Sequence, residues 1–389
     1  MSDSHRIALA EVVDLLEVGR PLPFHVLDGQ DRRLLAEGHV LVSDIQLEML
    51  IARGAWVQRS VVQALRAQHQ ARGTPVPSSR RTLSLFDHWE RLVWDLDATL
   101  RLVLAGKPAG DALTQLAERV EALVRRDADV ALFMMVRQHE PRFALYALLH
   151  ALHTATVLLV IGQQLGWDAG RLRLAVLGAL TMNVSMLELQ AQMAQQAEPP
   201  SPRQRKAIQE HPEASARLLR AAGVHDGLWQ QSVQEHHERP QGDGYPRGLT
   251  QVREEAHALR IADVFTAKIS ARAHRAPMPI QLAAKQLFQE ERGGPLAAGL
   301  IKALGLYPPG EWVELRNGEV AVVTRRGGNA TTPRVASVTN ASGRPVVATV
   351  ERDTARPEFA ITGALGAALA EKLQLPRIPP ERVYGLIPL

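Results

Sequence analysis

The chain has 389 residues, of which 46% are hydrophobic, and its formal net charge is only +4. That length accommodates two or three domains with a full core, and the small, scattered charge excess argues against a dedicated nucleic-acid-binding protein. The chain contains no cysteine, which excludes disulfides, iron–sulfur clusters, thiolate zinc sites and thiol catalysis. Any metal must therefore be held by His, Asp or Glu.

The N-terminal region predicts a small α+β module. After an opening helix, the segment PLPFHVLDGQDRRLLAEGHVLVS is typical of two strands joined at the Asp28-Gly29 turn. Ser43 then predicts a helix start, with Gln46 in the capping-box position and Gly54 as the stop. A connector rich in Pro, Ser and Gly, ARGTPVPSSRR, follows this module.

The middle of the chain predicts an almost wholly helical domain, because apolar residues recur there at three- and four-residue spacing. One helix begins at Ser201, with Pro202 at the first helical position and Gln204 three residues after the cap. Pro212 predicts a break in that helix, which would place His211 at a helix junction.

From about Tyr307 the pattern changes again. The segment EWVELRNGEVAVVTRRGGNATTPRVASVTNASGRPVVATV alternates β-branched residues with Asn-Gly and Gly-Gly turns, which predicts a small antiparallel sheet or barrel. The tail LPRIPPERVYGLIPL is expected to be irregular. The predicted parts are 1–72 for the N-terminal module, 73–82 for a linker, 83–306 for the helical domain and 307–389 for the β-rich extension and tail.

One run, from Phe143 to Gly166, is uncharged and long enough to span a bilayer. It contains two histidines and lies in a helical region, so we interpret it as a buried core helix rather than a membrane span. The N-terminus, MSDSHRIALAEVVDLLEVG, carries acidic residues where a signal peptide needs an apolar core. The sequence therefore predicts a soluble, cytoplasmic protein.

Several polar residues of the helical region are candidates for a metal site. They are His150, His153, His211, His236, His237 and Asp263. His150 and His153 share a helix face, and a carboxylate such as Asp263 on an apolar helix face is costly unless it is paired or bound to metal. Each residue alone has a simpler interpretation, as a satisfied core histidine or an aspartate paired with an arginine. Their occurrence on four predicted helices favours a metal site.

The segment HHERPQGDGYPRGL, which begins at His236, closely resembles the signature of HD-GYP domains. These form a branch of the HD metal-dependent phosphohydrolases that degrade cyclic di-GMP. The resemblance extends from about Phe143 to Leu306 and implies an HD-type helical bundle. It also implies metal ligands at the matching positions, which are His150, His211 of the His-Pro pair, His236, His237 and Asp263. The modules on either side are similar to ones that accompany this domain.

The chain departs from the family at one motif. The family carries an HD pair followed by lysine, as in LLHDIGK, where this chain has ALTMNVSM, so that Met182, Asn183 and Met186 stand at the His, Asp and Lys positions. The family aspartate bridges two metal ions, whereas an amide is a weak bridge and a thioether suits Mn, Fe or Mg poorly. The lysine would stabilise phosphate charge. No catalytic residue is then intact, and hydrolysis is expected to fall by several orders of magnitude.

The loop that follows the histidine pair is better preserved. Its glycines permit tight turns, Tyr245 with Pro246 can form an apolar wall, and two arginines can contact phosphates. The candidate loop, for a nucleotide or a partner, consists of Arg239, Gly242, Asp243, Gly244, Tyr245, Pro246 and Arg247.

The sequence is compatible with three functions, of which one is enzymatic. The first is a catalytically impaired HD-GYP protein of bacterial cyclic di-GMP signalling, which binds that nucleotide or a relative, or partners such as GGDEF-type and other signalling proteins. The alternative is a metal-dependent phosphodiesterase with a reduced site. The third is a scaffold that binds neither nucleotide nor metal. One Fe, Mn or Zn ion and a metal-free, hydrogen-bonded relic are expected equally, and a homodimer is a further expectation.

Overall fold

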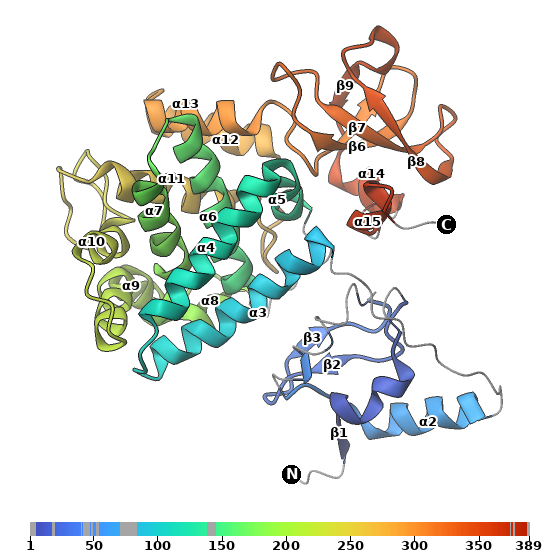
Figure 1. Ribbon diagram of the computed structural model, residues 1–389, viewed down its shortest axis with the longest axis horizontal. Helices are drawn as coiled ribbons and strands as arrows, with labels where there is room; N and C mark the ends of the chain where they lie inside the picture. The colour runs from blue at the N-terminus through green and yellow to red at the C-terminus, as the bar shows by residue number, and fades with distance from the viewer. Residues whose placement is uncertain are drawn as a thin grey trace. The chain divides into compact units, whose positions relative to one another are not determined.

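The computed structural model describes residues 5–17, 20–39, 41, 47, 50, 51, 54–70, 84–137, 145–373, 375 and 378–386. It divides into two compact units, Met1–Trp94 and Asp95–Leu389 (Figure 1). The mainly helical fold class with small terminal sheets is confirmed. The predicted helix start at Ser43 and Gln46 and the predicted linker 73–82 lie outside the described residues.

The first unit is built on a four-stranded antiparallel sheet in the order β1-β4-β2-β3. Its elements are β1 (Arg6–Ala8), the 3-10 helix η2 (Leu9–Leu15), β2 (Val26–Leu27), β3 (Arg33–Leu35), β4 (Trp56–Gln58) and α2 (Arg59–Gln70). The predicted two-strand turn is present, because the Asp28 carboxylate accepts hydrogen bonds from the backbone N–H groups of Gln30 and Arg32. The opening helix is of the 3-10 type.

The helical part of the second unit follows α3 (Leu85–Leu104), which crosses the boundary between the units. Its elements are α4 (Gly110–Arg126), α5 (Ala128–Val136), α6 (Tyr146–Gln164), α7 (Ala169–Thr181), the 3-10 helix η4 (Val184–Met186), α8 (Leu187–Gln195), α9 (Pro202–Ala221), α10 (Gly227–Glu235), α11 (Glu254–Ile269), α12 (Ile280–Glu290) and α13 (Pro295–Leu304). Helix α6 is the core helix: 16 of its 19 residues are buried, and it packs against α4, α5, α7, α8, α11 and α13 (Figure 1).

Two described helical segments, Tyr146–Gln164 and Ala169–Gln195, are long and apolar enough to cross a membrane. Both are largely buried against the rest of the structure, and a core helix of a soluble protein meets the same criterion. Their composition is therefore accounted for by packing inside the helical domain.

Helix α9 confirms one local prediction and corrects another. The capping box is present, with the Ser201 hydroxyl accepting from the Gln204 N–H and the Gln204 side chain accepting from the Ser201 N–H. The predicted break at Pro212 is wrong, because α9 runs without interruption through it, and His211 lies inside the helix. Pro212 and His211 are both buried, so packing compensates for the hydrogen bond that the proline cannot make.

The C-terminal part is a five-stranded antiparallel sheet in the order β8-β7-β6-β5-β9, as expected from its alternating pattern. Its elements are β5 (Trp312–Leu315), β6 (Val320–Arg325), β7 (Arg334–Thr339), β8 (Pro345–Asp353), η5 (Pro357–Phe359), β9 (Ile361–Ala364), α14 (Ala367–Lys372) and α15 (Pro380–Val383). Phe133 of α5 packs with Val322, Ala336 and Val383 in one buried cluster, which joins sheet and helices in the same unit. The expectation of an irregular tail is wrong at α15, where Pro380 occupies the first helical turn and does not interrupt it.

Candidate functional site

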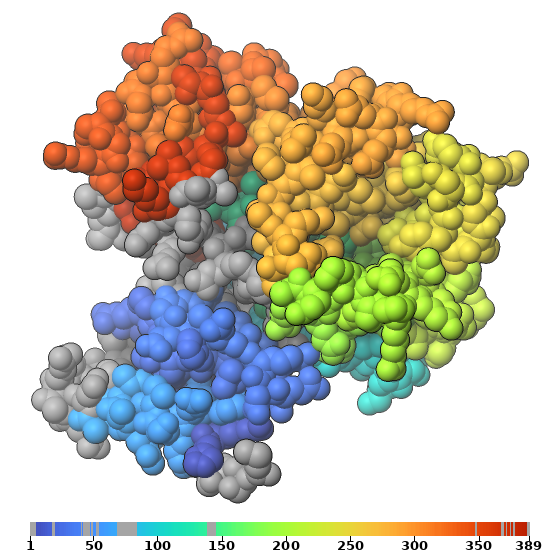
Figure 2. Space-filling model, turned by 180° about the vertical axis from the view of Figure 1, so that it is seen from behind, coloured from blue at the N-terminus to red at the C-terminus, as the bar shows by residue number. Residues whose placement is uncertain are grey.

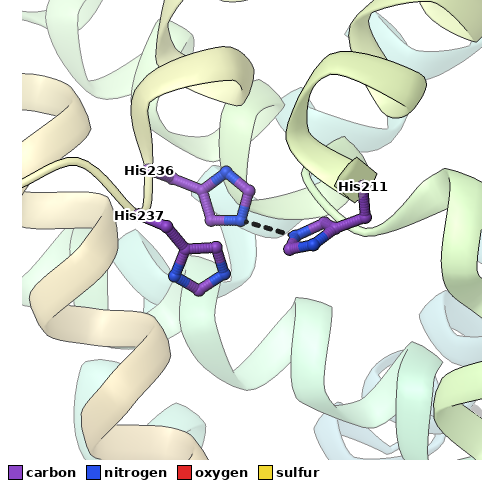
Figure 3. A group of neighbouring side chains, drawn as sticks. All are labelled: His211, His236 and His237. Carbon is purple, nitrogen blue, oxygen red and sulfur yellow. Dashed lines mark hydrogen bonds between the residues drawn. The ribbon is translucent and has the colours of Figure 1, made fainter. Parts of the chain in front are cut away.

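Three histidines, one from the middle of α9 and two from the end of α10, converge in the interior of the second unit. His211 belongs to α9, His236 caps the C-terminus of α10, and His237 follows directly. One ligand nitrogen from each ring lies within 4.8 Å of the other two, and the Nε2 atoms of His211 and His236 are 3.0 Å apart (Figure 3). The structure therefore brings together three of the five predicted metal-binding residues.

Backbone carbonyls orient two of these rings. Pro212 has no N–H, so the Ile208 carbonyl, four residues earlier in α9, receives no helical hydrogen bond from it. His211 Nδ1 lies 2.5 Å from that carbonyl oxygen, and His236 Nδ1 lies 2.7 Å from the Val233 oxygen at the end of α10. A carbonyl can only accept, so both Nδ1 atoms carry protons and both Nε2 atoms present lone pairs to the site when the rings are neutral.

The electrostatics favour neutral rings. Burial, together with the charge of His236, lowers the pKa of His211 to about 3. Burial also lowers the pKa of His236 and, strongly, the pKa of His237. Two neutral Nε2 lone pairs that face each other at 3.0 Å repel unless a cation lies between them.

The donor set fits one metal ion. At a metal–nitrogen distance of about 2.1 Å, two imidazole nitrogens lie about 3.0 Å apart at a right angle and about 3.4 Å apart at a tetrahedral angle. The 3.0 Å separation of the two Nε2 atoms falls at the lower end of that range. The His237 ring contributes a third ligand nitrogen within 4.8 Å of the other two. The three imidazoles can hold one ion and leave further coordination positions open.

The other two predicted ligands pair with each other. His150 Nε2 and Asp263 Oδ1 are 2.6 Å apart, and the His150 ring stacks on Tyr146 with centroids 5.7 Å apart. Burial acts to raise the pKa of Asp263, but the hydrogen bond and charge of His150 outweigh it and hold that pKa well below its usual value. The carboxylate therefore stays ionised beside the three histidines. His153 lies on the same helix and is also buried, but it does not line the pocket described below.

The loop after His237 is held by a carboxylate that the sequence interpretation overlooked. Glu238 is fully buried and accepts hydrogen bonds from the backbone N–H groups of Arg247 at 2.7 Å and Leu249 at 2.9 Å. A Cβ on Gly244 would lie within 2.6 Å of backbone atoms of the preceding turn, so only glycine fits there. This anchoring places the Tyr245 ring on His237, with ring centroids 4.5 Å apart.

The charged residues of the loop are engaged with each other and with neighbouring helices. Arg239 pairs with the exposed Asp243 at 3.0 Å. The Arg247 guanidinium lies 3.5 Å from Glu213 and 3.6 Å from Glu235. Neither arginine lines the pocket beside the histidines. In this structure both guanidinium groups neutralise local carboxylates.

A pocket of about 150 Å³ opens beside the histidine cluster. The predicted site residues that line it are His150, Asn183, Met186, His211, His237, Tyr245 and Asp263. Met182 is fully buried in the helical core and does not reach it. The segment that follows α7 thus presents an amide and a thioether to the pocket, where the family resemblance implies a bridging carboxylate and a lysine.

Among the pocket-lining residues that were not singled out from the sequence, three have polar side chains: Tyr146, Gln190 and Arg272. Arg272, in the segment after α11, donates to the Tyr146 hydroxyl from Nε at 3.0 Å and from Nη2 at 2.7 Å. That segment is tied to the end of α8 by the Ala273 N–H, which donates to the Ala194 carbonyl, and Figure 2 shows the two stretches side by side in light green and gold. Arg272 is the one formal cation among the described residues that line the pocket.

Comparison with family models identifies the domain type of the helical part. The HD domain family model matches residues 112–293, inside the predicted helical domain. A cyclic di-GMP phosphodiesterase from Pseudomonas aeruginosa is 25% identical over 195 residues, which cover 49% of this chain and 47% of that protein. The chain therefore spans about half the length of the curated relative that it matches. Among solved structures, an HDG"Y"P protein from Bdellovibrio bacteriovorus matches with a TM-score of 0.48 and 14% identity, over 76% of this chain and 97% of that one.

Proposed function

Because the chain is an HD-GYP domain protein whose HD domain covers residues 112–293, we propose that it binds cyclic di-GMP or a closely related nucleotide and does not hydrolyse it at the rate of an intact enzyme. In this proposal the bound nucleotide regulates the protein's interactions in bacterial signalling. The nucleotide class rests on the name of the Pseudomonas relative and on the HHERPQGDGYPRGL segment.

The observation that carries the proposal is the set of residues that line the pocket beside the histidines. Among the described residues that line the pocket, Asp263 is the one carboxylate, and its Oδ1 already contacts His150. Two adjacent metal ions repel each other and need bridging anions to share a site. Asn183 and Met186 supply none, so the pocket suits one metal ion and lacks the two-ion arrangement that stabilises both the attacking and the leaving oxygen.

Binding has more support than cleavage. The three imidazoles suit a single Zn or Fe ion, and Mn is a poorer match because it prefers oxygen ligands. When bound, such an ion supplies positive charge for a phosphate and lowers the pKa of a coordinated water. Arg272 adds a second positive group at the pocket wall. The volume of about 150 Å³ is below the roughly 300–1,000 Å³ of pockets that enclose whole ligands, so only part of a dinucleotide would be enclosed.

A reduced-site phosphodiesterase is the second candidate. It is favoured by the histidine cluster, which retains the donor set of a catalytic site with open coordination positions. Under this alternative, metal analysis finds a bound Fe, Mn or Zn ion and His236→Ala abolishes a measurable phosphodiesterase activity. Protein without bound metal, together with an activity unchanged by His236→Ala, would end this alternative.

The remaining expectations stay proposals. They are a soluble, cytoplasmic location, GGDEF-type or other signalling proteins as partners, a homodimer, and the functional division into 1–72, 83–306 and 307–389. Size-exclusion chromatography with light scattering, with and without cyclic di-GMP, measures the oligomeric state directly and shows whether the nucleotide changes it.

The proposal is tested by rebuilding the lost motif. The triple variant Met182→His, Asn183→Asp, Met186→Lys is compared with the wild type for metal content, cyclic di-GMP affinity and hydrolysis. We expect the wild type to bind the nucleotide with little turnover, and the variant to gain metal and activity. If the wild type binds no nucleotide under any metal condition, the proposal fails. If the variant gains neither metal nor activity, the motif is not what limits hydrolysis.

A further inference from the structure

Gln190 has an unusual environment for a glutamine on a short helix. It lies on α8, its side chain lines the pocket, and the residue is only 7% exposed. Its Oε1 atom is buried and makes no hydrogen bond to any described residue. Leaving a buried polar atom unpaired costs roughly 1–3 kcal/mol, and such groups in folded proteins usually have a partner.

The pocket-lining residues that η4 and α8 contribute carry no formal charge. The pocket-lining residues from the end of η4 and from α8 include Met186 and Met193 beside Gln190. The charged groups of the pocket belong to other elements: Asp263 is on α11 and Arg272 follows it. A phosphate is matched in charge by Arg272 and by a metal ion held at the histidines, whereas the side of the pocket formed by α8 presents the neutral Gln190 amide beside the apolar Met186 and Met193.

We infer that Gln190 is a specificity-determining residue that accepts a hydrogen bond from an N–H group of a guanine base in the bound nucleotide. This inference rests on the proposed nucleotide-binding function and adds which part of the ligand the α8 wall recognises. An ionised phosphate has acceptors and no donors, so it cannot satisfy the buried Oε1. Guanine offers N–H donors beside a carbonyl acceptor, which matches the donor and acceptor pair of a glutamine amide.

The inference predicts an unusual pair of effects for Gln190→Met, which keeps the side-chain length and removes both polar atoms. Cyclic di-GMP affinity is expected to fall about tenfold or more, the effect of losing one buried hydrogen bond. The melting temperature of the unliganded variant is expected to stay equal or rise, because no bond is lost and an unpaired buried acceptor is removed. A residue with a purely structural role would lower the melting temperature.

The experiment is calorimetric titration of wild type, Gln190→Met and Gln192→Met with cyclic di-GMP, inorganic phosphate and Zn²⁺, together with thermal melts of each protein alone. Gln192 lies on the exposed face of the same helix and serves as the matched control. We expect only Gln190→Met to lose nucleotide affinity, with phosphate and zinc affinities unchanged.

Two results overturn the inference while the proposed function stands. One is a wild type and a Gln190→Met variant that bind cyclic di-GMP equally. The other is a Gln190→Met variant that loses phosphate affinity or thermal stability in parallel with nucleotide affinity, since that pattern indicates a damaged pocket. A wild type that does not bind cyclic di-GMP at all overturns both proposals.

Discussion

Pro212→Ala isolates how the helix orients His211. The substitution returns a backbone N–H to residue 212, and in a continuous helix that N–H points at the Ile208 carbonyl. This is the same oxygen that lies 2.5 Å from His211 Nδ1. The new donor competes for it, so the imidazole loses the partner that keeps its proton on Nδ1 and its lone pair on Nε2.

The expected magnitudes separate stability from metal binding. Alanine is about 3 kcal/mol more favourable than proline inside a helix. Pro212 is buried, and losing about two methylene groups of packing costs about 1.6 kcal/mol. The variant should therefore be about as stable as the wild type or about 1 kcal/mol more stable. Its metal affinity should fall roughly 10- to 100-fold, the usual effect of removing the group that orients a metal-binding histidine.

The assay combines thermal unfolding of the metal-free protein, calorimetric titration with Zn²⁺, and nitrogen NMR of the His211 ring to identify its tautomer. Pro202→Ala is the matched control, since Pro202 is exposed at the first position of the same helix, where the missing N–H breaks no helical bond. Unchanged zinc affinity in Pro212→Ala, with the proton still on Nδ1, would refute the reasoning.

Three further predictions concern other parts of the chain. Glu238→Ala leaves two loop N–H groups without their buried acceptor and should lower the free energy of unfolding by about 2 kcal/mol or more in urea titrations; an unchanged midpoint contradicts the anchoring role. Burial raises the pKa of Glu311, whose carboxylate accepts from Gln281, from 4.5 to about 7. The folded state then holds a proton that the unfolded state releases, so the free energy of unfolding should fall, by on the order of 1–3 kcal/mol, as pH rises through that window. Glu311→Gln should remove this part of the pH dependence, and an identical pH profile would speak against it. His236→Ala should weaken zinc binding at least tenfold while the exposed His225→Ala does not; equal affinities would exclude the histidine cluster as the metal site.

Helix α9 shows which parts of the fold could be predicted from local sequence. The capping box at Ser201 depends on residues three apart, so its pattern is visible in the sequence and is confirmed. Pro212 misled the prediction because helix propensity describes an isolated helix, and here burial against the surrounding helices stabilises a continuous one. The short α15 was not predicted for a related reason. Prolines in the tail indicate irregular structure, and only the packing of the tail shows that Pro380 lies in the first turn of a helix.

The sequence predicts a site residue when its residue type is uncommon in the surrounding segment, such as a polar side chain on an apolar helix. Adjacent histidines and an aspartate on an apolar helix attract notice, and His236, His237 and Asp263 do lie at one pocket or beside it. Gln190 and Arg272 gave no such signal, because a glutamine on an amphipathic helix and an arginine after a helix are usually solvated. Their places in the pocket depend on how α8 packs against the segment after α11, which spacing along the chain does not reveal.

The most direct measurement is the turnover of cyclic di-GMP by the wild-type, metal-loaded protein at saturating nucleotide, with the Pseudomonas phosphodiesterase assayed alongside. Nucleotide binding is confirmed by calorimetry in the same preparation. With Asn183 and Met186 in the pocket wall, we predict bound nucleotide and a turnover at least about a thousandfold below that of the relative. A turnover comparable with that of the relative would contradict the proposal.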